Sequence, residues 1–144
     1  MTPAAFEAVP GGQDALLAGC RALAQTAGAS LLPPLAWRDV PRFLAGAAVT
    51  IVPSVRETFG NLALESLSAG TPVIAHATGN HPALLGPDGG VHVPLDAGPA
   101  GLREAAGELP GDPVRYHSVY GAAYCRSRNY RSALVADAFL KAVR

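Results

Sequence analysis

Short apolar runs alternate along the chain with longer segments whose apolar positions recur at helical spacing. Residues 47–52 form one such run, which stops at a proline, and residues 73–75 form another, which follows Gly70 and Pro72. Residues 60–69, between the two runs, are rich in leucine and alanine. Short β-branched runs bounded by breakers are typical of buried strands, and a leucine-rich segment closed by glycine is typical of a helix. This stretch is therefore predicted to fold as strand, loop, helix and strand.

The same pattern continues on both sides of this unit. Further strands are expected in three other short apolar runs, at residues 4–9, 30–32 and 91–93. Helices are expected at residues 14–27, 38–45 and 102–109, and the tail, residues 113–144, reads as two helices broken near Asn129. Strands that alternate with helices indicate an α/β fold with a parallel sheet.

Composition favours a globular chain of one domain, residues 1–144. Hydrophobic residues make up 49% and charged residues 15%, which argues against disorder. The 11 basic residues balance the 11 acidic ones, so no basic field is expected to attract nucleic acid or an anionic membrane. No apolar run approaches the roughly 20 residues of a spanning helix, and no secretory leader is recognisable. The expected compartment is the cytoplasm.

The cysteines and histidines show no spacing typical of a metal site. Cys20 and Cys125 lie far apart and are expected to be ordinary buried thiols, which suits a reducing compartment. We expect no metal and no cofactor. Of the four histidines, His81 is the one worth testing, because it follows the carboxyl end of a predicted strand, where open α/β sheets bind ligands.

The loop between the first predicted strand and the helix brings candidate chemistry to the helix N-terminus. The first amides of a helix have no intrahelical partner and lie at the positive end of its dipole, so they form an anion site. Gly60 would let a ligand approach the backbone closely. Glu57 precedes it and Glu65 follows eight positions after Glu57, a rise of about 12 Å in a regular helix. We therefore expect the two carboxylates to hold separate parts of one elongated ligand.

This stretch resembles the C-terminal, donor-binding domain of retaining GT-B glycosyltransferases of family 4. The resemblance lies in Glu57-Thr-Phe-Gly, in the seven residues between Glu57 and Glu65, and in the closing Ala69-Gly-Thr-Pro-Val-Ile. It implies that the chain binds a nucleotide-diphosphate sugar. The implied roles are sugar binding by Glu57, Phe59, Gly60 and Asn61, diphosphate binding by Gly60, Asn61 and Leu62, ribose binding by Glu65, and proximity of Leu35 and Ala36 to the base.

The resemblance also implies a fold and shows what this chain lacks. The family's domain is a Rossmann-like parallel sheet flanked by helices, with strand order 3-2-1-4-5-6, and the chain covers only its later part. The first, central strand is then missing, and residues 4–9 lose their inner neighbour. The Arg and Lys that neutralise the leaving diphosphate cannot be placed, so catalysis by this chain alone is doubtful. After the second strand of the motif, Asn80 and Ala83 replace a glycine and a glutamate of the family.

Several interpretations remain open at this point. The first is the donor domain of a retaining transferase that moves a hexose to an unknown acceptor, with a separate acceptor-binding domain or polypeptide as its partner. The second is a non-catalytic nucleotide-sugar-binding or interaction module, from a truncated or split enzyme. A nicotinamide-binding domain fits less well, since the chain lacks Gly-x-Gly-x-x-Gly after a first strand. Glu57 could also be a solvated loop carboxylate, and Glu65 an exposed helix acid paired with an arginine.

Overall fold

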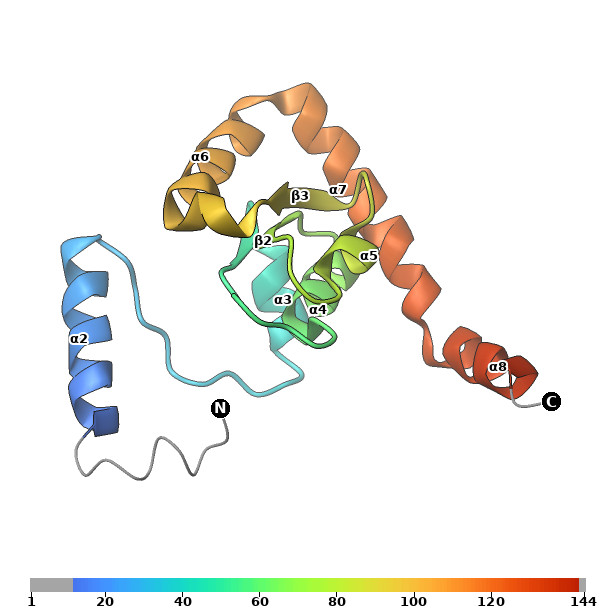
Figure 1. Ribbon diagram of the computed structural model, residues 1–144, viewed down its shortest axis with the longest axis horizontal. Helices are drawn as coiled ribbons and strands as arrows, with labels where there is room; N and C mark the ends of the chain where they lie inside the picture. The colour runs from blue at the N-terminus through green and yellow to red at the C-terminus, as the bar shows by residue number, and fades with distance from the viewer. Residues whose placement is uncertain (1–11, 143–144) are drawn as a thin grey trace. The chain divides into compact units, whose positions relative to one another are not determined.

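The computed structural model describes residues 12–142 and divides the chain into two compact units, residues 1–35 and 36–144 (Figure 1). The strand predicted at residues 4–9 lies outside the described residues, and a single domain over residues 1–144 stays a prediction.

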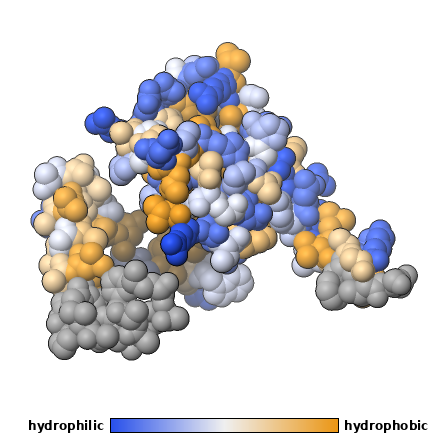
Figure 2. Space-filling model, in the orientation of Figure 1, coloured by the Kyte–Doolittle hydropathy of each residue, from blue (hydrophilic) through white to orange (hydrophobic). Residues whose placement is uncertain are grey.

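In its described part, residues 12–35, the first unit contains the helix α2 (Gly12–Thr26), which confirms the helix predicted from periodicity. Its apolar positions Leu16, Leu17 and Leu23 are exposed, and Figure 2 shows pale to deep orange residues over its surface. Cys20 on the same helix is also exposed, so the prediction of a buried thiol there is wrong. The strand predicted at residues 30–32 is wrong as well. This segment has no regular structure, because an extended chain becomes a strand only beside a hydrogen-bonding neighbour, and none of the described strands pairs with it.

The second unit is built on a parallel sheet. Among the described residues the sheet has three strands in the order β1 (Thr50–Val52), β2 (Val73–His76) and β3 (Gly90–Val93). Ile51 pairs with Ile74, and Ala75 with His92. This confirms an α/β, Rossmann-like fold. On its outer side β1 pairs with no strand of residues 12–142, and the absence of a first strand stays a prediction.

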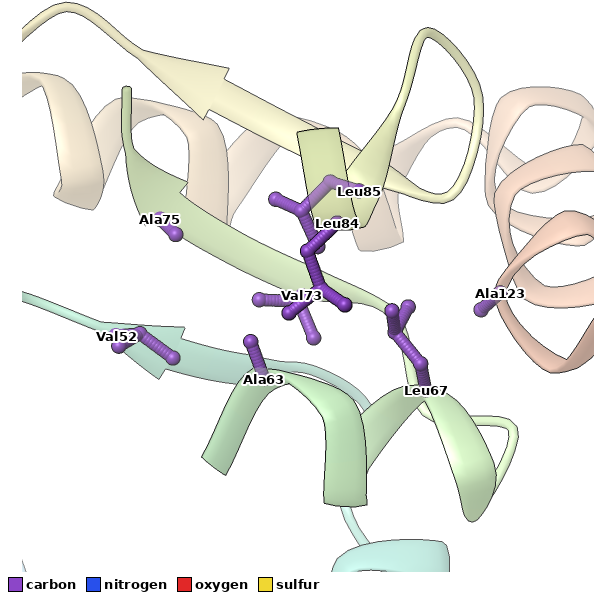
Figure 3. Close-up of a cluster of buried hydrophobic side chains, with 8 residues drawn as sticks. All are labelled: Val52, Ala63, Leu67, Val73, Ala75, Leu84, Leu85 and Ala123. Carbon is purple, nitrogen blue, oxygen red and sulfur yellow. The ribbon is translucent and has the colours of Figure 1, made fainter. Parts of the chain in front are cut away.

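Helices cover both faces of this sheet, as the alternation of side chains along β2 requires. Val73 and Ala75 point to the face covered by α4 (Asn61–Ser68) and α5 (His81–Leu85), and Figure 3 shows the cluster there. Ile74 points to the other face, covered by α6 (Gly98–Gly111). The first cluster comprises Val52, Ala63, Leu67, Val73, Ala75, Leu84, Leu85 and Ala123, and the second comprises Ile74, Val93, Leu102, Ala105, Leu109 and Val119.

Helix α7 (Pro113–Ser127) joins the two clusters, because it gives Ala123 to the first and Val119 to the second. Cys125 is exposed, contrary to the prediction of a buried thiol. The buried stripe of α7 recurs every four residues, at positions 119, 123 and 127, so a residue two positions after Ala123 faces away from the core.

Four further elements belong to the described part of the second unit. These are α3 (Val40–Ala45), η1 (Leu95–Ala97), η2 (Arg128–Tyr130) and α8 (Ser132–Ala142). Element η2 separates α7 from α8, which confirms the break predicted near Asn129. Thr71 ties α3 to the sheet, because its Oγ1 donates to the carbonyl of Leu44 at 2.7 Å.

Arg126 of α7 holds the C-terminal end of α5. Its Nε donates to the carbonyl of Leu84 at 3.1 Å, and its Nη2 donates to that of Ala83 at 2.8 Å. We expect Arg126→Ala to lower the free energy of unfolding by about 1.5–3 kcal/mol, because hydrogen bonds from a charged donor are lost. Urea denaturation measures this, with Arg128→Ala as an exposed control expected to stay within about 0.5 kcal/mol of the wild type. Equal losses in the two variants would contradict the assignment.

Candidate functional site

The predicted ligand loop lies at the carboxyl end of β1. The strand ends at Val52, residues 53–60 form the loop, and α4 begins at Asn61. Gly60 is the N-cap, with φ of 91° and ψ of 52°. This is left-handed backbone that a residue with a Cβ adopts only at a cost, so the turn into α4 requires glycine.

The amides around this turn bond to none of the residues that the structure describes. Within the part of the chain that the structure describes, no hydrogen bond is donated by the backbone amides of residues 59–62. The first backbone bond at this end of α4 runs from the amide of Leu64 to the carbonyl of Gly60, at 3.0 Å. The unpaired amides lie at the positive end of the α4 dipole, where an anion is stabilised.

The loop after β2 supports the loop after β1 at three successive residues. Thr78 Oγ1 donates to the carbonyl of Val55 at 3.3 Å, and Asn80 Nδ2 donates to that of Phe59 at 3.2 Å. Between them Gly79 packs so closely on Glu57 that a Cβ at position 79 would lie 1.9 Å from the Glu57 carbonyl oxygen. The two loops therefore form one structure at the carboxyl ends of adjacent parallel strands, where α/β sheets bind ligands.

Sequence reasoning missed this support. Asn80 was noted only as a departure from the family's glycine, but its amide fixes the carbonyl of Phe59 and so orients the turn before α4. The short helix α5, which begins directly after Asn80, was not predicted either. Two signals in the sequence could have found it: the turn residues Thr78-Gly79-Asn80 after a strand, and an asparagine followed by Pro82, which is typical of a helix start.

Glu57 and Glu65 occupy different environments. Glu57 is half-buried, and one of its carboxylate oxygens accepts a hydrogen bond from the amide of Thr58 at 3.0 Å. Glu65 is exposed on α4, on the side opposite the buried Ala63, Ser66 and Leu67. No arginine forms an ion pair with Glu65 in residues 12–142. The action of the two carboxylates on one ligand stays a prediction.

The other residues singled out in the sequence are Leu35, Ala36 and His81. Leu35 and Ala36 fall on either side of the boundary between the two units, so a base site there stays a prediction. His81 is fully buried behind Gly60, and its ring Nδ1 lies 3.0 Å from the carbonyl oxygen of His76.

Residues 12–142 contain no group of three or more His, Cys, Asp or Glu side chains that could hold a metal ion. Among the helices that the structure describes, none has the length and apolar character needed to cross a membrane.

Several known proteins are similar to this chain in sequence. Similar curated proteins include the D-inositol 3-phosphate glycosyltransferase of Frankia alni, 32% identical over 106 residues, which are 74% of this chain and 22% of that protein. That of Salinispora arenicola is 46% identical over 48 residues, 33% of this chain and 11% of that protein. The MMP alpha-(1->4)-mannosyltransferase of Mycolicibacterium hassiacum is 39% identical over 51 residues, 35% of this chain and 12% of that protein. The chain thus spans less than a quarter of these three relatives.

A solved structure supports the fold. The C-terminal domain of the glycosyl transferase group 1 family protein LpcC from Francisella tularensis superposes with a TM-score of 0.66, at 17% identity, over 91% of this chain and 66% of that one. The chain therefore has the fold of a GT-B C-terminal domain. A family model described as "Glycosyl transferases group 1" matches residues 7–112. The chain belongs to the glycosyl transferases group 1 family.

Proposed function

We propose that this chain is the donor-binding domain of a retaining glycosyltransferase of family 4, which transfers a hexose from a nucleotide-diphosphate sugar. The observation that carries the proposal is the set of unpaired amides at residues 59–62, at the N-terminus of α4. A diphosphate offers the several acceptor oxygens and the negative charge that such donors bind. The support of this loop by residues 78–80 favours a preformed site, which lowers the entropic cost of binding.

The proposed roles follow the order of the residues around the turn. The amides of Gly60, Asn61 and Leu62 hold the diphosphate, and Phe59 and Asn61 contribute to the sugar site beside Glu57. Glu65, on the outer side of α4, accepts hydrogen bonds from the ribose hydroxyls. The exposed Glu65 side chain, without an ion pair among the described residues, is available for this role.

Transfer also requires a site for the acceptor, which we assign to a separate domain or polypeptide. The relatives named as glycosyltransferases support sugar transfer as the chemistry, and this chain corresponds to 22% or less of the three described above. Departure of a nucleoside diphosphate develops negative charge, which the α4 amides would stabilise in part.

Cys20 and Cys125, both exposed and free, suit the reducing cytoplasm.

Binding of UDP or GDP tests the proposal. In the ¹⁵N-labelled chain we expect at least one of the two nucleotides to shift the amide resonances of residues 59–62. Glu65→Ala is expected to weaken binding at least about tenfold, because hydrogen bonds between the ribose and a charged acceptor are lost. Glu104→Ala, another exposed helical glutamate, is the control and should bind as the wild type does. Unmoved amides at saturating UDP and GDP would refute a donor site at α4.

A further inference from the structure

His81 presents a buried nitrogen, Nε2, to the proposed site, and this nitrogen has no hydrogen-bond partner among residues 12–142. The side chain is fully buried, and its Nε2 is among the buried polar atoms that bond to nothing within the described residues. An unpaired polar atom in the interior costs free energy, so it requires an explanation.

The partner of the other ring nitrogen fixes the chemistry of Nε2. Nδ1 lies 3.0 Å from the carbonyl oxygen of His76, and a carbonyl can only accept. Nδ1 therefore carries the proton of the neutral ring, and Nε2 carries the lone pair. The free atom is an acceptor, which seeks an N–H or O–H group.

The Nε2 edge of the ring faces the N-cap of α4. A Cβ at position 60 would lie 3.0 Å from Cδ2 of His81 and 3.3 Å from its Nε2. The backbone of Gly60 thus lies directly against this edge, immediately before the unpaired amides of α4. The turn combines several donors that suit an anion with one buried acceptor that does not.

We propose that His81 is a specificity residue for the sugar, and that its Nε2 accepts a hydrogen bond from a sugar hydroxyl of the bound donor. This inference rests on the proposed function and goes beyond it by separating two ligands. The phosphates of UDP or GDP carry acceptor oxygens at neutral pH, so they satisfy the amides but leave Nε2 unpaired. A sugar hydroxyl supplies the missing donor. The Gly60 turn closes Nε2 from solvent. The diphosphate therefore binds the preformed amides as they stand, and only the bond between the sugar hydroxyl and Nε2 requires a local shift of Gly60.

Two substitutions separate this role from a structural one. In His81→Asn the side-chain amide can still donate to the His76 carbonyl, but no atom remains at the position of Nε2. In His81→Gln an amide oxygen can take the place of Nε2 as acceptor, while the bond to His76 is lost. If His81 only fills the core, each substitution weakens the binding of nucleotide and nucleotide sugar by the same factor. If His81 binds the sugar, His81→Asn weakens the binding of the nucleotide sugar more than that of the nucleotide, and His81→Gln does not.

Calorimetry on the full chain measures the affinities for UDP-glucose, UDP, GDP-mannose and GDP. The quantity compared is the affinity for the nucleotide sugar divided by the affinity for the corresponding nucleotide. For the nucleotide that binds, we expect His81→Asn to lower the ratio at least about tenfold and His81→Gln to keep it within about threefold of the wild type. An unchanged ratio in His81→Asn, including equal losses for both ligands, would overturn the inference while leaving the donor site intact. If His81→Asn does not fold, His81→Phe, which fills the core without an acceptor nitrogen, takes its place: a ratio at least about tenfold lower supports the inference, and an unchanged ratio overturns it. A wild-type chain that binds neither nucleotide nor nucleotide sugar would instead refute the proposed function, and the inference with it.

Discussion

Leu67→Ala is expected to lower the free energy of unfolding by about 2.7–5 kcal/mol, because it removes a fully buried side chain and leaves a cavity. Leu67 lies on α4 and packs in the cluster that contains Val73 of β2 and Ala123 of α7 (Figure 3). Truncation would thus loosen the contacts that hold α4 between the sheet and α7. A loss of this size is a large fraction of the stability of an ordinary small domain.

Leu62→Ala is the matched control for this prediction. It makes the same chemical change on the same helix, but Leu62 is 44% exposed and belongs to neither buried cluster. We expect a loss below about 1 kcal/mol. Urea denaturation followed by circular dichroism compares the two variants. Similar midpoints would show that Leu67 does not anchor α4.

The strand, loop, helix and strand of the motif could be predicted because strong local signals mark each boundary. Gly70 and Pro72 end the helix whatever the tertiary context, and α4 and β2 begin close to the expected residues. The start of β1 was less certain. The apolar run begins at residue 47, but the strand begins at Thr50, whose amide bonds to the Pro72 carbonyl. That boundary is set by a residue more than 20 positions away.

Burial was harder to predict than periodicity. The spacing of apolar residues predicted α2 correctly, but the leucines on its apolar face are exposed. Helical periodicity identifies an apolar face without showing what covers it. Cys125 illustrates a second limit. A cysteine in an apolar helix suggests burial, yet the choice among possible faces of α7 depends on how that helix contacts both clusters at once.

The candidate site also has a part that local sequence rules predict and a part that depends on tertiary contacts. The requirement for glycine at position 60 and the unpaired amides after it follow from local rules about helix ends. The support from Thr78, Gly79 and Asn80 does not, because each contact joins residues more than 20 positions apart. The orientation of His81 likewise depends on where α5 packs. The conformational propensities of single residues do not predict such contacts between loops that are distant in the sequence.

Gly79 offers the sharpest test of these contacts. Its φ of 52° lies in the left-handed region, and a Cβ there would lie 1.9 Å from the carbonyl oxygen of Glu57. Backbone cannot rotate away as a flexible side chain can, so the loop that carries Glu57 has to move. We expect Gly79→Ala to lower the free energy of unfolding by about 2–5 kcal/mol, as the sum of left-handed strain and overpacking. We also expect it to abolish the shifts that UDP or GDP cause at residues 59–62.

Gly121→Ala separates the close packing at Gly79 from the general effect of replacing a glycine. Gly121 is exposed on α7, and a Cβ there would meet nothing within 4 Å. Alanine should therefore stabilise the helix by about 0.5–1 kcal/mol and leave nucleotide binding unchanged. Opposite signs for the two substitutions, measured by urea denaturation, are the expected result. If Gly79→Ala kept both its stability and the nucleotide-induced shifts, the loop after β2 would not position the loop that carries Glu57, and the preformed donor site would lose its structural basis.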